Sequence, residues 1–239
     1  MIRALVVWAL LAGPAAALTC GVETFDGVDY SVCSVDLPED RLALFLNGSD
    51  GAPLGGFSGI EQGLAEGETL AFAMNAGMFH PDRAPVGLFV QDGVEVARLQ
   101  PNAGPGNFGL LPNGVFCIGD GWARVIETRA YLDEAPACRD ATQSGPMLVI
   151  DGALHPRFLP GSTSRLVRNG VGTSADGRRA IFAISDAPVN FHAFARFFRD
   201  HLGLDQALYL DGKVSRLHAP ALGRSDIGLP LGPMVGVVE

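Results

Sequence analysis

The sequence predicts an α+β fold: a single compact domain of mostly antiparallel or mixed β-sheet with a few helices. Three observations predict it. Short apolar runs recur between turn-forming residues, and the chain holds 31 glycines and 16 prolines. Asp-Gly pairs stand between apolar flanks at Asp92-Gly93, Asp151-Gly152 and Asp176-Gly177, a strong signal for tight hairpins. Helical periodicity is confined to three short stretches.

Composition excludes several classes of protein. The chain has 239 residues, of which 48% are apolar, so it can bury a sizeable core. It has no Gly-X-Y repeat, linker or low-complexity segment. The net charge is −9 and the pI is about 5.0. We expect no nucleic-acid partner, because binding to a phosphate backbone requires a basic surface.

Residues 1–17 are typical of a secretory signal peptide. Arg3 gives a positive start, residues 4–12 are apolar, and Ala15 to Ala17 supply the small residues before a cleavage site. The apolar run is too short to span a bilayer, which needs about 20 residues. We expect a periplasmic or secreted protein of residues 18–239 that is free of the membrane. A first core strand is the alternative for residues 4–12. Lipid attachment at Cys20 is disfavoured, because Leu18-Thr19 precedes it where such a site has Gly or Ala. Loss of Arg3 changes the net charge to −10.

The cysteines are expected to form two disulfides. Cys20, Cys33, Cys117 and Cys138 allow three pairings, and export places them in an oxidising compartment. We favour Cys20–Cys33 and Cys117–Cys138, because each closes a short local loop. There is no Cys-x-x-Cys motif and no histidine spaced to complete a zinc site, so we expect neither a metal nor another cofactor.

Nine apolar runs are predicted as strands, and the repeated hairpins imply antiparallel pairing. They are Tyr30–Val35, Leu42–Leu46, Leu70–Met74, Gly87–Gln91, Gly114–Ile118, Pro146–Ile150, Ala180–Ile184, Ala207–Leu210 and Met234–Val238.

Three helices are predicted. Ser58-Gly59-Ile60-Glu61 forms a capping box that opens a short helix ending at Gly67. A second helix covers Thr128 to Glu134. The third runs from Val189 to Leu202, with a buried apolar stripe that we interpret as core packing. That stripe is Phe191, Phe194, Phe198 and Leu202.

Four segments place polar residues at strand ends, where loops commonly carry binding and catalytic groups. The first holds Asn75, Gly77 and His80, and an ordinary turn is its alternative. Gly77 permits a close backbone approach to a ligand. In the second, the backbone amides of Ser144 and Gly145 precede a proline and are expected to face a ligand.

The third and fourth segments carry charge. Arg165 and Arg168 lie among small and hydroxyl residues, and the guanidinium fork suits a carboxylate or phosphate; solvated surface arginines are the alternative. Asp211 ends an apolar strand before Gly212. A carboxylate at a sheet edge can act as an acid, a base or an orienting group, whereas a plain Asp-Gly hairpin turn is the competing interpretation.

Taken in order, the four segments resemble the phosphodiester glycosidase family. That family shows Asn-Gly-Gly-aromatic-Phe, Gly-Gly-Pro, Arg-Thr/Ser-x-Ile/Val-Gly and Leu-Asp-Gly-Gly-x-Ser. The matching stretches are 75–79, 144–146, 168–172 and 210–215, and the resemblance extends over about residues 70–239. Ala76, Ser144 and Lys213 stand where the family has glycine.

The resemblance implies hydrolysis of the bond between a sugar anomeric carbon and a phosphodiester, on envelope or extracellular glycans. We expect Asp211, Arg168 and Asn75 to be catalytic. Asp211 would steady the sugar cation or activate water, Arg168 would clamp the phosphate, and Asn75 would bind sugar hydroxyls or fix Asp211. The expected substrate-binding residues are Gly77, His80, Ser144, Gly145, Asn169, Gly212 and Ser215.

Other functions compete with this hypothesis. A non-catalytic module that binds envelope glycans or exopolysaccharide is the main alternative. A serine hydrolase using Ser144 or Ser215 lacks the Gly-x-Ser-x-Gly elbow. A metallohydrolase is disfavoured, because the five histidines show no paired ligand spacing. For a second carboxylate, Asp151 and Asp186 are weaker candidates than Asp211.

Overall fold

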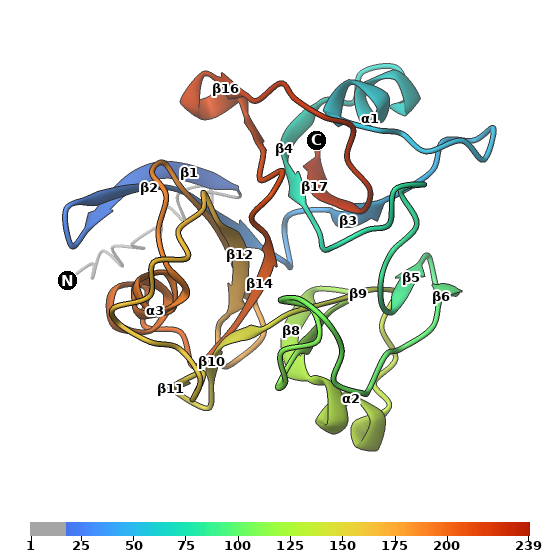
Figure 1. The fold of residues 1–239 in the computed structure, drawn as a ribbon. Helices are drawn as coiled ribbons and strands as arrows, with labels where there is room; N and C mark the ends of the chain where they lie inside the picture. Colours follow the sequence, from blue (N-terminus) through green and yellow to red (C-terminus); the bar gives the residue numbers. More distant parts are fainter. Residues whose placement is uncertain (1–17) are drawn as a thin grey trace, which may run out of the picture.

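The computed structural model describes residues 18–239 (Figure 1), so the expected signal peptide lies outside the described residues. The described chain forms three sheets. The seven-stranded sheet has the order β1 (Thr19–Phe25), β2 (Val28–Asp36), β13 (Arg179–Ser185), β12 (Asn169–Thr173), β14 (Gln206–Asp211), β10 (Met147–Ile150) and β11 (Ala153–Leu154).

Each of the other two sheets has five strands. The β4 sheet has the order β16 (Arg224–Ser225), β15 (Leu217–Ala219), β4 (Leu70–Asn75), β17 (Met234–Val238) and β3 (Leu42–Phe45). The β9 sheet has the order β6 (Val94–Ala97), β5 (Phe89–Gln91), β9 (Asp140–Ser144), β7 (Gly114–Gly119) and β8 (Trp122–Glu127).

Neighbouring strands in all three sheets pair antiparallel, which confirms the predicted fold class. The three predicted Asp-Gly hairpins are also confirmed: they join β5 to β6, β10 to β11 and β12 to β13. At Asp92 and Gly93 the φ angles are 51° and 76°. Both residues are therefore left-handed, as a two-residue hairpin turn requires.

One aromatic contact marks where the three sheets meet. Phe182 of the seven-stranded sheet lies 4.9 Å from Phe72 of the β4 sheet and 5.7 Å from Phe116 of the β9 sheet, between ring centroids. All three side chains are fully buried. Figure 1 shows the three sheets arranged around the centre of the molecule, and one buried apolar cluster takes side chains from all three.

The first two predicted helices are present and short, and the first begins differently from its prediction. Helix α2 covers Thr128–Glu134 as expected, and Glu127 caps it by accepting from the amides of Arg129 and Ala130. Helix α1 covers Phe57–Gly63 and starts after Gly56 without a side-chain cap. The predicted capping box at Ser58 is therefore wrong, because burial of Phe57 and Ile60 sets the start of the helix.

The third helix is interrupted. Helix α3 covers Phe191–Arg196 and continues as a π-helical turn, η1 (Phe197–His201). Asn190 caps α3, since its side chain accepts from the amide of Ala193. A short 3-10 turn, η2 (Pro220–Leu222), follows β15. No helix within residues 18–239 is long and apolar enough to cross a membrane.

Both predicted disulfides are confirmed. Cys20 and Cys33 face one another across β1 and β2 and are bonded. Cys117 in β7 is bonded to Cys138, which follows α2. The first bridge joins β1 to β2, and the second joins the segment after α2 to β7.

Strands β9 and β12 were predicted only as polar segments at strand ends. Every residue of Asp140–Ser144 and of Asn169–Thr173 is buried. A methyl group at Gly170 would lie 2.7 Å from the Leu208 carbonyl oxygen, so glycine is needed for this strand to approach β14. These two strands could not be recognised from the sequence, because most of their residues are polar or glycine rather than apolar.

Candidate functional site

Polar residues from different sheets meet at one junction of strand ends. Asn75 ends β4, Ser144 ends β9, Asn169 begins β12 and Asp211 ends β14. Asn169 and Asp211 are register partners across β12 and β14. The junction therefore draws on all three sheets, and hydrogen bonds join its members.

Asn75 is the centre of this junction. Its Oδ1 accepts from Asn169 Nδ2 at 3.2 Å and from the amide of Arg216 at 2.7 Å. Its Nδ2 donates to the Val214 carbonyl at 3.0 Å and lies 3.5 Å from Asp211 Oδ2. The side chain is fully buried. These contacts occupy the amide, and they favour the second expected role of Asn75, which was to fix Asp211.

Asp211 is held by one carboxylate oxygen. Oδ1 accepts from the amides of Gly212 and Lys213 at 2.5 and 2.9 Å. Its own amide donates to Asn169 Oδ1 at 2.7 Å. The hydrogen bond from Asn75 Nδ2 to Oδ2 is long, at 3.5 Å, and the Val214 amide is a further backbone donor to the carboxylate. The carboxyl group is therefore oriented while one oxygen remains weakly engaged.

The environment also shifts the acidity of Asp211. The residue is 7% exposed, and burial raises the pKa of its carboxyl above the usual value. The backbone amides and the Lys213 charge act in the opposite direction but do not cancel the effect of burial. A carboxyl with a raised pKa in a buried setting is a candidate for acid or base chemistry.

The Asp211-Gly212 pair does not form a hairpin. Strand β14 lies in the seven-stranded sheet, whereas β15, the next strand along the chain, pairs with β4. Residues 212–216 thus cross between two sheets. Ser215 Oγ supports the crossing, since it lies 2.9 Å from the Val167 carbonyl oxygen and 3.0 Å from that of Asp211. The hairpin interpretation of this segment is therefore wrong.

Two further predicted residues connect the β9 sheet to the junction. Ser144 Oγ donates to the Leu210 carbonyl at 3.0 Å, and Ser144 is fully buried. Gly77 has a φ of 153°, and a methyl group there would lie 3.2 Å from Thr142 Oγ1. Thr142 in turn donates to the Ala76 carbonyl at 2.9 Å. Gly77 and Ser144 therefore sit where two sheets pack together.

Arg168 lies beneath the junction rather than on its surface. Its side chain is fully buried, Nε donates to the Val189 carbonyl at 2.9 Å and Nη2 donates to the Ser164 carbonyl at 3.2 Å. The guanidinium stacks 3.7 Å from the Phe191 ring centroid. Burial lowers its pKa. This differs from the expected clamp in direct contact with a phosphate, because the charged group has no exposed surface.

Gly145 and His80 also differ from the junction residues. A methyl group at Gly145 would lie 2.6 Å from Asn113 Cβ, so this buried glycine serves close packing. His80 is exposed in the loop after β4, where its amide donates to the Ala84 carbonyl. No hydrogen bond within residues 18–239 joins its ring to the junction, and its binding role remains a prediction.

Tyr209 is a neighbour of the junction that the sequence did not single out. A methyl group at Gly212 would lie 2.2 Å from the Tyr209 hydroxyl oxygen. The Tyr209 ring packs edge-on against Phe191 at 4.8 Å, and burial raises the pKa of its phenol. Tyr209 precedes Asp211 by two residues on β14, and that spacing could have identified it, because alternate strand residues share a face.

The weaker carboxylate candidates lie elsewhere. Asp186 pairs with Arg224 at 2.6 Å and accepts from Ser31. Asp151 accepts from Gln206 at 2.6 Å, at the opposite end of β14 from Asp211. Both carboxylates are thus outside the junction. Within residues 18–239, no group of three or more His, Cys, Asp or Glu side chains is arranged to hold a metal ion.

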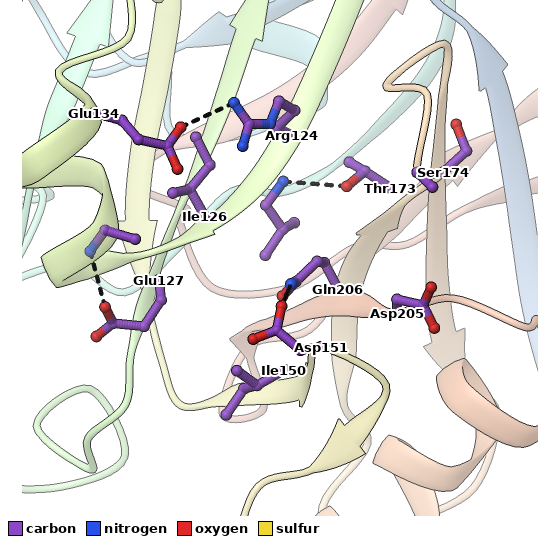
Figure 2. Close-up of a pocket in the computed structure, with 13 residues that line it drawn as sticks. Arg124, Ile126, Glu127, Glu134, Ile150, Asp151, Thr173, Ser174, Asp205 and Gln206 are labelled. Carbon is purple, nitrogen blue, oxygen red and sulfur yellow. Dashed lines mark hydrogen bonds and ion pairs between the residues drawn. The ribbon is translucent and has the colours of Figure 1, made fainter.

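A pocket of about 360 Å³ lies at that opposite end (Figure 2). Glu127 caps α2, Glu134 pairs with Arg124, and Asp151 accepts from Gln206. Three of its acidic groups therefore have structural partners. Thr173 and Gln206 line it from the ends of β12 and β14 that are remote from Asn169 and Asp211.

The phosphodiester glycosidase family profile matches residues 68–218, which span the whole junction. The chain belongs to the phosphodiester glycosidase family. One relative, the uncharacterized protein YigE of Escherichia coli K12, is 30% identical over 185 residues, or 77% of this chain and 72% of YigE.

Solved structures show the same fold. The catalytic domain of zebrafish N-acetylglucosamine-1-phosphodiester alpha-N-acetylglucosaminidase superimposes with a TM-score of 0.62 at 16% identity, over 92% of this chain and 81% of that one. A protein of Burkholderia pseudomallei K96243 gives a TM-score of 0.57 at 13% identity, over 88% of this chain and 74% of that one. At these identities the likeness concerns the fold alone.

Proposed function

We propose that the chain is an exported hydrolase that cleaves the bond between a sugar anomeric carbon and a phosphodiester oxygen. Family membership supports the reaction class. The observation that carries the proposal is the Asp211 carboxyl group, which is fixed through Oδ1 and leaves Oδ2 weakly engaged. Residues 1–17 and the two disulfides support export and an envelope or extracellular glycan as substrate.

The proposed chemistry places Asp211 at the anomeric carbon. Cleavage of a glycosidic bond passes through a transition state with oxocarbenium character. Asp211 Oδ2 would stabilise that positive charge or accept a proton from the attacking water. The phosphodiester leaves as a stable anion, so the site needs less help from a general acid than it would for an ordinary glycoside.

Asn75 and Asn169 are positioning residues in this proposal. Asn169 holds the Asp211 amide, and Asn75 holds both Asn169 and the segment that follows Asp211. Precise placement of a reacting group can contribute a large part of a rate enhancement. Arg168 is assigned a supporting role, because it packs against the Tyr209 ring at 5.3 Å beside the junction.

The test is turnover of a panel of sugar-1-phosphodiesters by purified residues 18–239, with release of free sugar as the readout. Asp211→Asn should lower kcat by at least ~10²-fold, the scale of lost acid–base or electrostatic help. Asp151→Asn is the matched control, because it removes a carboxylate from the far end of β14 and should leave turnover unchanged. Wild-type turnover by folded Asp211→Asn would refute the proposal, and tight binding without release of sugar would favour a glycan-binding module.

A further inference from the structure

The chain contains one lysine, and it lies at the junction. Of its 17 basic residues, Lys213 is the single lysine and the others are arginines. Lys213 follows Asp211 by two residues, and its amide donates to Asp211 Oδ1. Its side chain is exposed. Within residues 18–239, no carboxylate oxygen lies within 4.0 Å of its ammonium group.

Two arginines near the junction are not available to a ligand in the same way. Arg168 is fully buried and donates to two carbonyl groups. Arg216 is 9% exposed, and its Nη2 donates to the Leu229 carbonyl at 2.6 Å. Its guanidinium lies 5.6 Å from the Phe57 ring centroid, in the packing between α1 and the β4 sheet. Each guanidinium keeps one nitrogen without a hydrogen-bond partner, Nη1 of Arg168 and Nε of Arg216, but both of these nitrogens are buried.

Another cation beside the crossing is Arg165, which is exposed. The next residue, Leu166, lies against Gly212, since a methyl group there would be 3.2 Å from Leu166 Cδ1. Lys213 and Arg165 therefore flank the crossing from two chain segments. Of these two residues, Lys213 is the one whose backbone amide donates a hydrogen bond to the Asp211 carboxylate.

An anionic substrate needs accessible positive charge at this place. The protein has a net charge of −10 over residues 18–239, which opposes the approach of an anion. A lysine ammonium is a mobile point charge with three donors and is a common ligand of phosphate. The Cα atoms of residues two apart are at most about 7 Å from one another. The Lys213 ammonium can therefore reach a substrate atom that neighbours the atom contacted by Asp211.

We propose that the Lys213 ammonium binds the phosphate of the substrate and makes the site selective for anionic leaving groups. This inference rests on the proposed function, in which Asp211 acts at the anomeric carbon. The scissile bond then lies between the two side chains. Lys213 places its positive charge beside the non-bridging oxygens of the leaving group and donates no proton to it.

The first test uses the single lysine as a chemical probe. Wild-type residues 18–239 are acetylated with N-hydroxysuccinimidyl acetate in inorganic phosphate, in a sugar 1-phosphate, or in sodium chloride of equal ionic strength. Peptide mass spectrometry then measures the modified fraction of Lys213. We expect both phosphates to slow the modification relative to chloride, while the amino terminus reacts equally in all three. Equal Lys213 modification in the three solutions would overturn the inference, whether or not the protein turns over any substrate.

The second test compares two substrates that share a sugar: a sugar-1-phosphodiester and the neutral nitrophenyl glycoside. Lys213→Met should raise KM for the phosphodiester about 10- to 100-fold, the effect of losing one charge-assisted contact. KM for the neutral glycoside should change little. Lys213→Arg should restore much of the loss, and Arg129→Met, which removes an exposed charge on α2, should behave like wild type.

The outcomes separate the two proposals. Turnover of the phosphodiester with an unchanged KM in Lys213→Met would overturn the role of Lys213 and leave the reaction intact. Protection of Lys213 by phosphate without turnover of any phosphodiester would support the anion site and argue against the hydrolase. An equal rise in KM for both substrates would show that Lys213 does not distinguish the two leaving groups, and would also overturn the inference.

Discussion

At the scale of single residues, the junction depends on amide side chains as much as on its acid. Asn75 and Asn169 use their oxygen and nitrogen atoms on one another and on backbone groups around Asp211. An asparagine can both donate and accept, and so can bridge strands that belong to different sheets. The carboxyl group is thereby placed by neutral neighbours, and burial alone sets the direction of its pKa shift.

This shift predicts a pH-dependent effect on stability. Because the pKa of Asp211 is raised in the folded protein, folding favours its protonated form, and the favourable contribution is lost as pH rises through that pKa. In the Asp211→Asn variant the neutral amide does not titrate. The free energy of unfolding of this variant, minus that of wild type, should therefore increase between pH 4 and pH 8, as measured by urea denaturation.

The same comparison for Asp151→Asn serves as the control, since Asp151 is exposed and lies at the far end of β14. Its difference from wild type should change less over the same pH range. A difference that stays flat with pH for Asp211→Asn would contradict the burial of an ionised carboxyl at the junction.

Residue patterns predicted the members of the junction better than their orientations. Asn75, Ser144, Asn169, Asp211 and Ser215 follow from polar residues at the ends of apolar runs, and the structure joins each of them to the junction. Arg168 and Asn169 are adjacent at the start of a strand, so their side chains point to opposite sides. Both side chains are buried. Nothing in the motif says which of the two faces Asn75 and Asp211; the structure gives that place to Asn169, whereas Arg168 packs against Phe191.

At the scale of elements, the π-helical turn of the α3–η1 segment changes which residues of the helix are buried. An ideal helix from Val189 to Leu202 would place Phe191, Phe194, Phe198 and Leu202 on one stripe. The π-helical turn adds a residue, so that Phe197 and Phe198 are both fully buried. Phe197 stacks on Tyr30 of β2 with ring centroids 3.8 Å apart. Leu202 is only half-buried. Periodicity alone could not predict this change of register.

Truncation can test that register. Phe197→Ala should lower the free energy of unfolding by about 3–5 kcal/mol, as expected for a large buried aromatic residue. Leu202→Ala should cost clearly less, because its side chain is already partly in solvent. Chemical denaturation of both variants measures the difference. A larger loss for Leu202→Ala would favour the regular helix over the π-helical turn.

At the scale of the whole molecule, chain order and spatial order differ strongly. The hairpins are local and were predictable from Asp-Gly pairs. The assembly of strands into three sheets was not, because β4, β12 and β14 are distant in sequence and their partners are chosen by a shared core around Phe182. The family resemblance supplied the order of the motifs, but the physical cause of their meeting is this core.

Export and oxidation can be tested together on residues 1–239. Expressed with residues 1–17 in a bacterial host, the protein should be recovered from the periplasm with Leu18 as its first residue and no free thiol. Intact mass and thiol titration measure both. Residues 18–239 made in a reducing cytosol should melt at a lower temperature, because each missing crosslink of this loop size removes about 3 kcal/mol. Retention of Met1 or four titratable thiols in the periplasmic protein would contradict the prediction.

The crossing of residues 212–216 has one more consequence. It begins on the seven-stranded sheet and ends on the β4 sheet, and Ser144 of the β9 sheet donates to the Leu210 carbonyl in the strand just before it. No sheet taken alone holds the complete junction, so a partly assembled protein with every strand paired would still lack it. During refolding, catalytic turnover should therefore appear later than the circular dichroism signal of β-structure. Recovery of turnover would therefore measure the packing of the sheets against one another rather than the formation of each sheet.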